Sequence, residues 1–215
     1  MRGNRPPWVT KPTDRFLLRW IKERLAARIT PKVATVTWIR PWTVTLASAG
    51  LGVLGGVAFA LCMPFGAAVA ILASQVLDGV DGQLARLRGE DSPWGAFLDS
   101  VMDRYSDGAV LVGLSIGVWR TLQSVPDWVV LCVSVSALIG SGLISYTKAR
   151  ARELGLDLGA PTLASKGTRF SAMALGGLLS PILPEGPALA LLYLALHTQG
   201  AVLLSLLRTR KGHGF

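Results

Sequence analysis

Long apolar stretches, separated by short polar breaks, dominate the pattern of this chain. A helix that crosses a membrane needs roughly 20 apolar residues, and six candidate segments are present, of which residues 65–77 and 170–183 fall short of that length. They cover residues 43–62, 65–77, 94–119, 128–146, 170–183 and 188–207. Proline and glycine mark the breaks, as in the turn Pro64–Gly66 and the loop Pro181–Pro187. The pattern therefore predicts an all-α, polytopic membrane bundle of six transmembrane helices.

The composition agrees with a membrane protein rather than a soluble one. Hydrophobic residues make up 51% of the 215 residues, and the mean hydropathy is positive. The two cysteines, Cys62 and Cys132, lie in apolar segments. We expect them to be small buried hydrophobic residues rather than a disulfide or a metal pair.

Positive charge is concentrated in particular segments of the chain, whose formal net charge is +9. Lys and Arg occur in the N-terminal segment, after Asp78, between Lys148 and Arg169, and in the C-terminal tail. Cytoplasmic loops carry such an excess, so we expect both termini and the acidic motif on the cytoplasmic side of a prokaryotic cell membrane. The distribution fits topology better than a nucleic-acid groove, so no nucleic-acid partner is expected.

The same pattern divides the chain into three parts. Residues 1–40 form a cytoplasmic N-terminal segment, residues 41–207 the six-helix domain, and residues 208–215 a basic cytoplasmic tail. Within the first part, Asp14–Ile29 places apolar residues such as Trp20, Ile21 and Leu25 on one side, with basic residues among them or opposite. We expect an amphipathic helix in the plane of the membrane interface.

Five aspartates stand out because ionisable groups at membrane depth are costly and usually functional. Asp78 and Asp81 are three residues apart, and Asp99 and Asp103 are four apart, so each pair shares one face of a helix. Asp107 extends the second stripe by one turn. Two such helices facing each other would line a pocket with oxygen ligands suited to Mg²⁺, Mn²⁺ or Ca²⁺. The cluster contains no His or Cys, which argues against catalytic zinc.

Small residues and one arginine accompany these acids. Gly82, Ala85 and Gly95 leave room for a substrate beside the carboxylates, and Arg86 offers a fork that matches a phosphate. Acids, a metal and an arginine together indicate phosphoryl transfer at a pyrophosphate. An alternative from another class is an ion pathway in a metal-coupled transporter, since transporters also hold paired acids in the membrane.

The spacing D-x-x-D-G-x-x-A-R, eight residues, then G-x-x-x-D-x-x-x-D resembles the signature of the CDP-alcohol phosphotransferase family. The resemblance implies a transferase of phospholipid biosynthesis that releases CMP and uses two divalent cations, Mg²⁺ or Mn²⁺. It assigns the metal ligands to Asp78, Asp81, Asp99 and Asp103, with Asp103 also the general base on the acceptor hydroxyl. It assigns CDP binding to Asp81, Gly82, Ala85, Arg86 and Gly95.

Two further segments, Ser145–Arg150 and Ser165–Arg169, resemble the inositol-phosphate-using branch of that family. The resemblance implies that Lys148, Lys166 and Arg169, in an expected cytoplasmic loop, bind the phosphate of the acceptor. Inositol phosphate is the expected polar alcohol, with glycerol 3-phosphate as an alternative. The expected donor is CDP-diacylglycerol, with a soluble CDP-alcohol left open. The resemblance also implies a homodimer.

Overall fold

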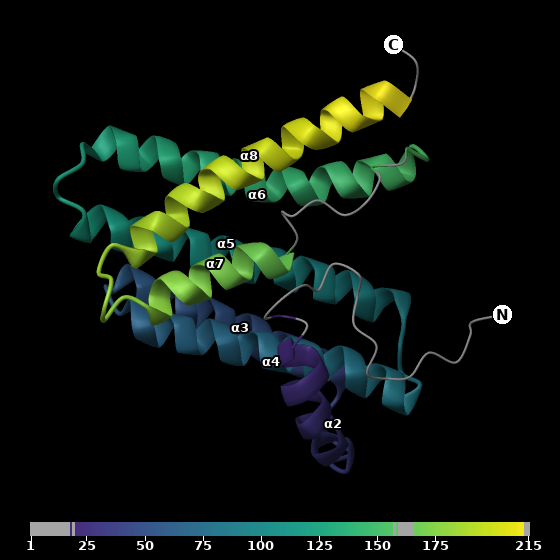
Figure 1. Ribbon diagram of the computed structural model, residues 1–215. Coiled ribbons are helices and arrows are strands. Elements are labelled where there is room, and N and C mark those ends of the chain that lie inside the picture. Colours follow the sequence, from purple (N-terminus) through teal and green to yellow (C-terminus); the bar gives the residue numbers. More distant parts are fainter. Residues whose placement is uncertain (1–17, 19, 157, 159–165, 213–215) are drawn as a thin grey trace.

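The computed structural model describes residue 18, residues 20–156, residue 158 and residues 166–212, with the backbone alone at 210–212. Its described part contains helices and no strand, and the longer helices lie side by side in a bundle (Figure 1). They are η1 (Ile21–Ala26), α2 (Ala27–Ala34), α3 (Pro41–Ala60), α4 (Pro64–Arg88), α5 (Pro93–Thr121), α6 (Asp127–Glu153), α7 (Lys166–Leu178) and α8 (Gly186–Gly212). The all-α prediction is confirmed for these residues.

Local sequence signals explain where the central helices begin and end. Helices α3 and α4 start with Pro41 and Pro64, and proline suits the first helical turn because its missing N–H would be unpaired there anyway. Helix α5 follows Ser92, whose hydroxyl accepts a hydrogen bond of 3.1 Å from the Gly95 N–H. Helix α4 ends at Gly89, whose φ of 65° is left-handed and favours glycine.

Close backbone contacts hold α3, α4 and α5 together. The Ser48 hydroxyl donates to the Ser74 carbonyl and the Ser74 hydroxyl donates to the Ser48 carbonyl, both at 2.8 Å, between α3 and α4. A Cβ atom on Gly113 of α5 would collide with the carbonyl of Gly56 on α3. Small residues therefore let these backbones approach closely, as in other membrane bundles. Helix α7 packs on α4 and α8, and α8 packs on α6.

Four helices are long and apolar enough to cross a membrane: α3, α4, α6 and residues 186–209 of α8. Helix α5 is 29 residues long but carries the acidic stripe, and α7 has only 13 residues. At about 1.5 Å per residue, α7 is roughly 20 Å long, whereas the apolar layer of a bilayer is about 30 Å thick. The predicted span over residues 170–183 therefore ends early, at Leu178, and six spans remain a prediction.

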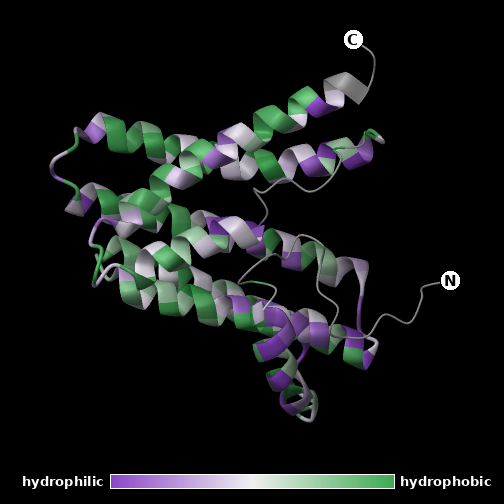
Figure 2. Ribbon diagram, in the orientation of Figure 1, coloured by the Kyte–Doolittle hydropathy of each residue, from purple (hydrophilic) through white to green (hydrophobic). Residues whose placement is uncertain are grey.

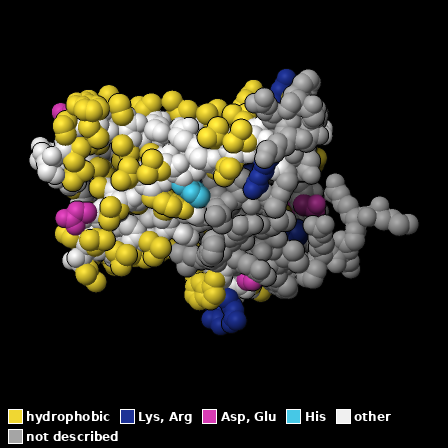
Figure 3. Space-filling model, turned by 45° about the horizontal axis from the view of Figure 1, so that its top comes forward, with side chains coloured by type: hydrophobic (Ala, Val, Ile, Leu, Met, Phe, Trp, Pro, Cys, Tyr) yellow, Lys and Arg dark blue, Asp and Glu magenta, His cyan; other side chains and the backbone are white. Residues whose placement is uncertain are grey.

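The outward surface is rich in apolar side chains. Much of α6 and α8 is hydrophobic, whereas the N-terminal helix formed by η1 and α2 is mixed, with hydrophilic residues such as Lys22, Glu23 and Arg24 (Figure 2). On the face shown in Figure 3, hydrophobic side chains are widespread and the Lys and Arg side chains lie away from one end. Cys62 and Cys132 are exposed on this surface, so the expectation that they are buried is wrong. A membrane protein exposes such residues because lipid, not a protein core, covers them.

Elements η1 and α2 are consecutive and together form one N-terminal helix. This helix crosses the bundle and packs against α4 (Figure 1). Its buried side includes Ile21 and Ala26, whereas Trp20 is exposed, so the apolar residues do not all share one face. Residues 14–17 and 19 of the predicted amphipathic helix lie outside the described residues. The part that is described uses its apolar side to contact protein, and its position at the membrane interface stays a prediction.

This helix also continues beyond its predicted end at Ile29, through Pro31 to Ala34. A proline removes only one backbone hydrogen bond, and tertiary contacts compensate for that loss here. The buried Thr30 hydroxyl lies 2.8 Å from both the Ala26 carbonyl and the Gln83 side-chain oxygen on α4. The helix is thus anchored immediately before the proline.

Candidate active site

An acidic cluster forms where α4 and α5 face each other. Asp78, Asp99 and Asp103 each contribute a carboxylate oxygen, and these three oxygens lie within 4.8 Å of one another. The Asp78 side chain is 7% exposed and that of Asp103 is 18% exposed. Helical spacing brings Asp99 and Asp103 onto one face, and the packing of both α4 and α5 on α3 brings Asp78 beside them. Three of the four predicted metal ligands are therefore brought together.

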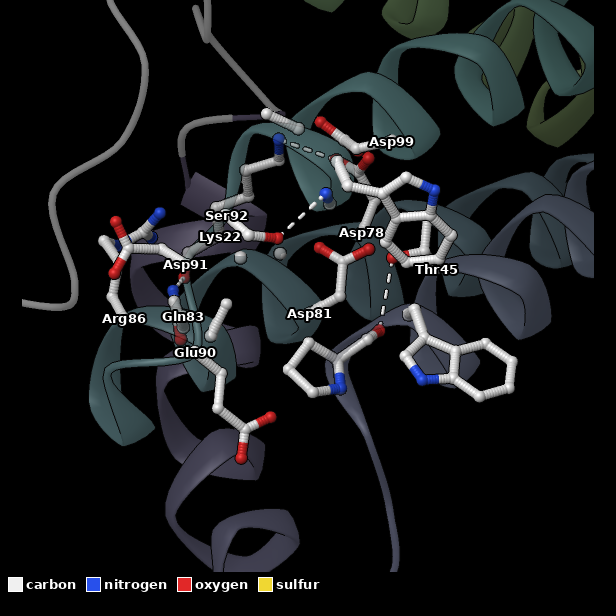
Figure 4. Close-up of a pocket in the computed structure, with 18 residues that line it drawn as sticks. Lys22, Thr45, Asp78, Asp81, Gln83, Arg86, Glu90, Asp91, Ser92 and Asp99 are labelled. Carbon is white, nitrogen blue, oxygen red and sulfur yellow. Dashed lines mark hydrogen bonds and ion pairs between the residues drawn. The ribbon is translucent and has the colours of Figure 1, made fainter.

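The fourth predicted ligand, Asp81, lies one turn further along α4 and is 5% exposed. It faces the same region as Asp78 and Asp99 (Figure 4). Its Oδ2 atom is buried and has no hydrogen-bond partner among the described residues. An unpaired buried carboxylate oxygen is costly unless a cation or a donor satisfies it. This oxygen and the nearby carboxylates fit a hard divalent cation such as Mg²⁺ or Mn²⁺.

Two lysines contact the acidic cluster. Lys22 Nζ of η1 lies 2.7 Å from Asp78 Oδ2 (Figure 4). Lys166 Nζ of α7 lies 3.1 Å from Asp78 Oδ1 and 2.7 Å from Asp103 Oδ1. Each ammonium group reduces the repulsion between neighbouring carboxylates, as a bound metal ion would. The cluster is therefore arranged around positive charge.

A cavity of about 290 Å³ opens on one side of the cluster, lined by parts of η1, α3, α4 and α5. All five residues predicted to bind CDP line it, namely Asp81, Gly82, Ala85, Arg86 and Gly95. A Cβ atom on Gly82 would meet nothing closer than Arg86 Nη1 at 3.4 Å, so the space beside this glycine is open. Trp42 and Trp94 line the same cavity, and sequence reasoning assigned no role to either.

A second cavity, of about 380 Å³, lies on the other side of the cluster and is basic. The predicted acceptor residues Lys148, Lys166 and Arg169 all line it, together with Asp103. They do not lie in a loop as expected. Lys148 is in the last turns of α6, and Lys166 and Arg169 begin α7. Rigid helices therefore present the three cations, which suits a pocket of defined geometry.

Asp107, which extends the acidic stripe, contacts cations of the second cavity. Its Oδ2 atom accepts a hydrogen bond of 3.0 Å from Arg169 Nη2 and lies 3.6 Å from Arg104 Nη2. Arg104 also donates to the Ser145 hydroxyl on α6. Asp107 is not one of the three aspartates that could hold a metal ion, and its hydrogen bond to Arg169 orients that guanidinium group.

Sequence reasoning missed Lys22, which lines both cavities. The residue lies in the N-terminal segment that was assigned to the membrane surface. No local signal in the sequence separates it from the other basic residues of that segment, because its partner Asp78 lies far away in the chain, on α4. A lysine is almost never fully buried unless it is paired, and the structure supplies that pairing through tertiary packing.

These observations define an integral membrane helical protein with an acidic site, suited to a divalent metal ion, between two cavities. A family model described as CDP-alcohol phosphatidyltransferase matches residues 22–205. The chain belongs to this family, which confirms the resemblance seen in the acidic motif.

Relatives from several organisms support the same branch. The chain is 34% identical over 186 residues to a bifunctional IPC transferase and DIPP synthase of Rubrobacter xylanophilus, covering 82% of this chain and 38% of that one. It is 38% identical over 138 residues to a phosphatidylinositol phosphate synthase of Streptomyces avermitilis, covering 61% and 53%. The chain thus spans about half or less of the length of these two relatives.

Solved structures of a Mycobacterium tuberculosis phosphatidylinositol phosphate synthase share the fold. The structure with CDP-DAG bound has a TM-score of 0.74 at 27% identity, covering 85% of this chain and 94% of that one. The structure in complex with manganese and citrate has a TM-score of 0.75 at 26% identity, covering 86% and 88%.

Proposed function

We propose that this protein transfers a phosphatidyl group from CDP-diacylglycerol to a hydroxyl of inositol phosphate and releases CMP. The acidic cluster between two cavities is the observation that carries the proposal. Asp78 and Asp99 line the cavity with the predicted CDP residues, whereas Asp103 lines the basic cavity. The arrangement suits a donor on one side and a phosphorylated alcohol on the other.

In the proposed reaction, the acceptor oxygen forms a bond to the phosphorus of the donor, and the bond from that phosphorus to CMP breaks. Asp103 accepts the hydroxyl proton, for which its position on the acceptor side is suitable. Asp78, Asp81, Asp99 and Asp103 would hold two divalent cations, Mg²⁺ or Mn²⁺. When bound, such cations neutralise charge on the diphosphate and on the departing CMP.

The donor cavity supports a nucleotide diphosphate. Gly82 leaves one wall of the cavity open, and Arg86 beside it provides a fork for phosphate oxygens. The acceptor cavity supports a phosphate monoester because Lys148, Lys166 and Arg169 converge on it. Glycerol 3-phosphate has the same charged group, so the acceptor must be identified by direct comparison.

We also propose the finer topology. Six spans would include α5 and α7, whose polar and short segments are shielded by the other helices. The acidic site and both termini would face the cytoplasm, on the basis of the excess of Lys and Arg near the site. A homodimer is expected from the family resemblance.

The test is CMP release by the purified protein in lipid nanodiscs with radiolabelled CDP-diacylglycerol and Mg²⁺. We expect turnover with inositol phosphate that exceeds turnover with glycerol 3-phosphate, serine or inositol. Asp103→Asn should abolish turnover while CDP binding persists, because the proton acceptor is lost whereas Asp78, Asp81 and Asp99 remain as carboxylate ligands. Absence of CMP release with every acceptor, together with Mn²⁺ uptake into proteoliposomes, would instead support the transporter.

A further inference from the structure

Lys22 lies at the boundary between the two cavities, on an element outside the acidic motif. Its side chain is 9% exposed, and its ammonium group lies 2.7 Å from Asp78 Oδ2. The residue lines the donor cavity together with Arg86 and the acceptor cavity together with Lys148. A single flexible cation can therefore reach the space on both sides of the acidic cluster.

The structure holds the backbone of Lys22 independently of its charge. Gln83 Nε2, itself buried, donates a hydrogen bond of 2.9 Å to the Lys22 carbonyl. Gly79 allows the close approach, because a Cβ atom there would lie 2.8 Å from the Ala26 side chain and 3.0 Å from Lys22 Cγ. Helix η1 is thus docked on α4 by backbone and methylene contacts. None of these contacts involves the ammonium group.

The contact between Lys22 and Asp78 is in conflict with metal binding. Asp78 belongs to the three-residue cluster whose geometry suits a divalent cation. A cation at that place would repel an ammonium group only 2.7 Å from the Asp78 carboxylate. The lysine stem has four rotatable bonds, so the ammonium group can move into either cavity while its backbone stays in place.

We propose that Lys22 is a substrate-phosphate ligand, which holds Asp78 in the metal-free protein and binds a phosphate oxygen once a divalent cation occupies the cluster. The inference rests on the proposed function for the identity of the phosphate. That phosphate is either the monoester of the acceptor or the diphosphate of the donor, since Lys22 lines both cavities. A charged hydrogen bond to phosphate compensates the ammonium group for the lost carboxylate.

The experiment compares Lys22→Met with Lys32→Met. Methionine keeps the apolar stem beside Gly79 and removes the charge. Lys32 is an exposed lysine on α2 that lines neither cavity, so its variant controls for loss of one positive charge near the site. Lys22→Arg keeps the charge and should retain substrate binding better than Lys22→Met.

Mn²⁺ binding, measured without substrates by calorimetry, is the first readout. We expect Lys22→Met to bind Mn²⁺ several-fold more tightly than wild type and Lys32→Met to bind it as wild type does, because a competing cation has been removed from Asp78. Unchanged or weaker Mn²⁺ binding in Lys22→Met would overturn the proposal that Lys22 leaves Asp78 when a divalent cation binds.

Apparent KM values are the second readout. Lys22→Met should raise KM by about tenfold or more for one substrate, as expected when a charged hydrogen bond is lost. A rise for inositol phosphate assigns Lys22 to the acceptor, and a rise for CDP-diacylglycerol assigns it to the diphosphate. KM values within twofold of those of Lys32→Met would refute the proposal.

Two checks keep these outcomes interpretable. If Lys22→Met does not fold, Lys22→Gln tests the same loss of charge with a side chain that ends in a neutral polar group. If the wild-type protein itself releases no CMP, the proposed function fails, whereas the Mn²⁺ titration still decides whether Lys22 competes with metal.

Discussion

Replacing Asp107 by asparagine removes the carboxylate that orients Arg169 in the basic cavity. The two side chains are 16% and 5% exposed, and their contact is 3.0 Å long. Breaking a buried ion pair by removing one partner costs about 3–5 kcal/mol, because the other charge stays buried without compensation. Asparagine keeps one acceptor oxygen, so we expect a loss near the lower end, about 3 kcal/mol. The second contact of Asp107, with the half-exposed Arg104 at 3.6 Å, adds little.

Unfolding of the purified variant in mixed micelles, followed by helical circular dichroism, measures this free energy. The same variant should raise the apparent KM for inositol phosphate and leave the KM for CDP-diacylglycerol unchanged, because Arg169 lines only the basic cavity of the two. The double variant Asp107→Leu with Arg169→Met should recover most of the stability, since neither charge is then left alone. It should not recover acceptor binding. A stability loss below about 1 kcal/mol with an unchanged acceptor KM would show that Asp107 does not position Arg169.

Two glycines should respond in opposite ways to substitution. Gly82→Leu should abolish CDP binding, because the added side chain projects into open space in the donor cavity. The thermal midpoint of unfolding should stay unchanged within a few degrees. Normal nucleotide binding would contradict the donor assignment. Gly113→Ala should destabilise the protein by about 1–3 kcal/mol, because the new methyl group collides with the Gly56 carbonyl and separates α3 from α5. An unchanged thermal midpoint would show that these helices shift at no cost in stability.

The predictions from sequence were correct for features that depend on the residues of a single helix. Spacings of three and four residues predict which aspartates share a face, and Asp99 and Asp103, four residues apart on α5, both belong to the acidic cluster. Apolar length likewise predicted helices close to α3, α6 and α8. The small residues beside the acids predicted open space, and Gly82 and Gly95 both line a cavity.

Pairings between distant segments could not be predicted in this way. Lys166 contacts Asp78 across 88 residues, and Gln83 contacts Lys22 across 61. The hydrophobic pattern of the N-terminal helix does not distinguish a lipid surface from the surface of α4, because both accept the same apolar residues. Nor could the length of an apolar run show that α7 ends at Leu178.

The sequence by itself determined the acidic stripe, the helices that carry it and the residue types suited to a metal and a diphosphate, since these follow from local spacing and chemistry. Only the tertiary structure decided that the cluster separates two cavities, that Asp107 pairs with Arg169, and that Lys22 reaches both sides. These features depend on how helices far apart in the chain pack, and close packing between small residues determines that arrangement.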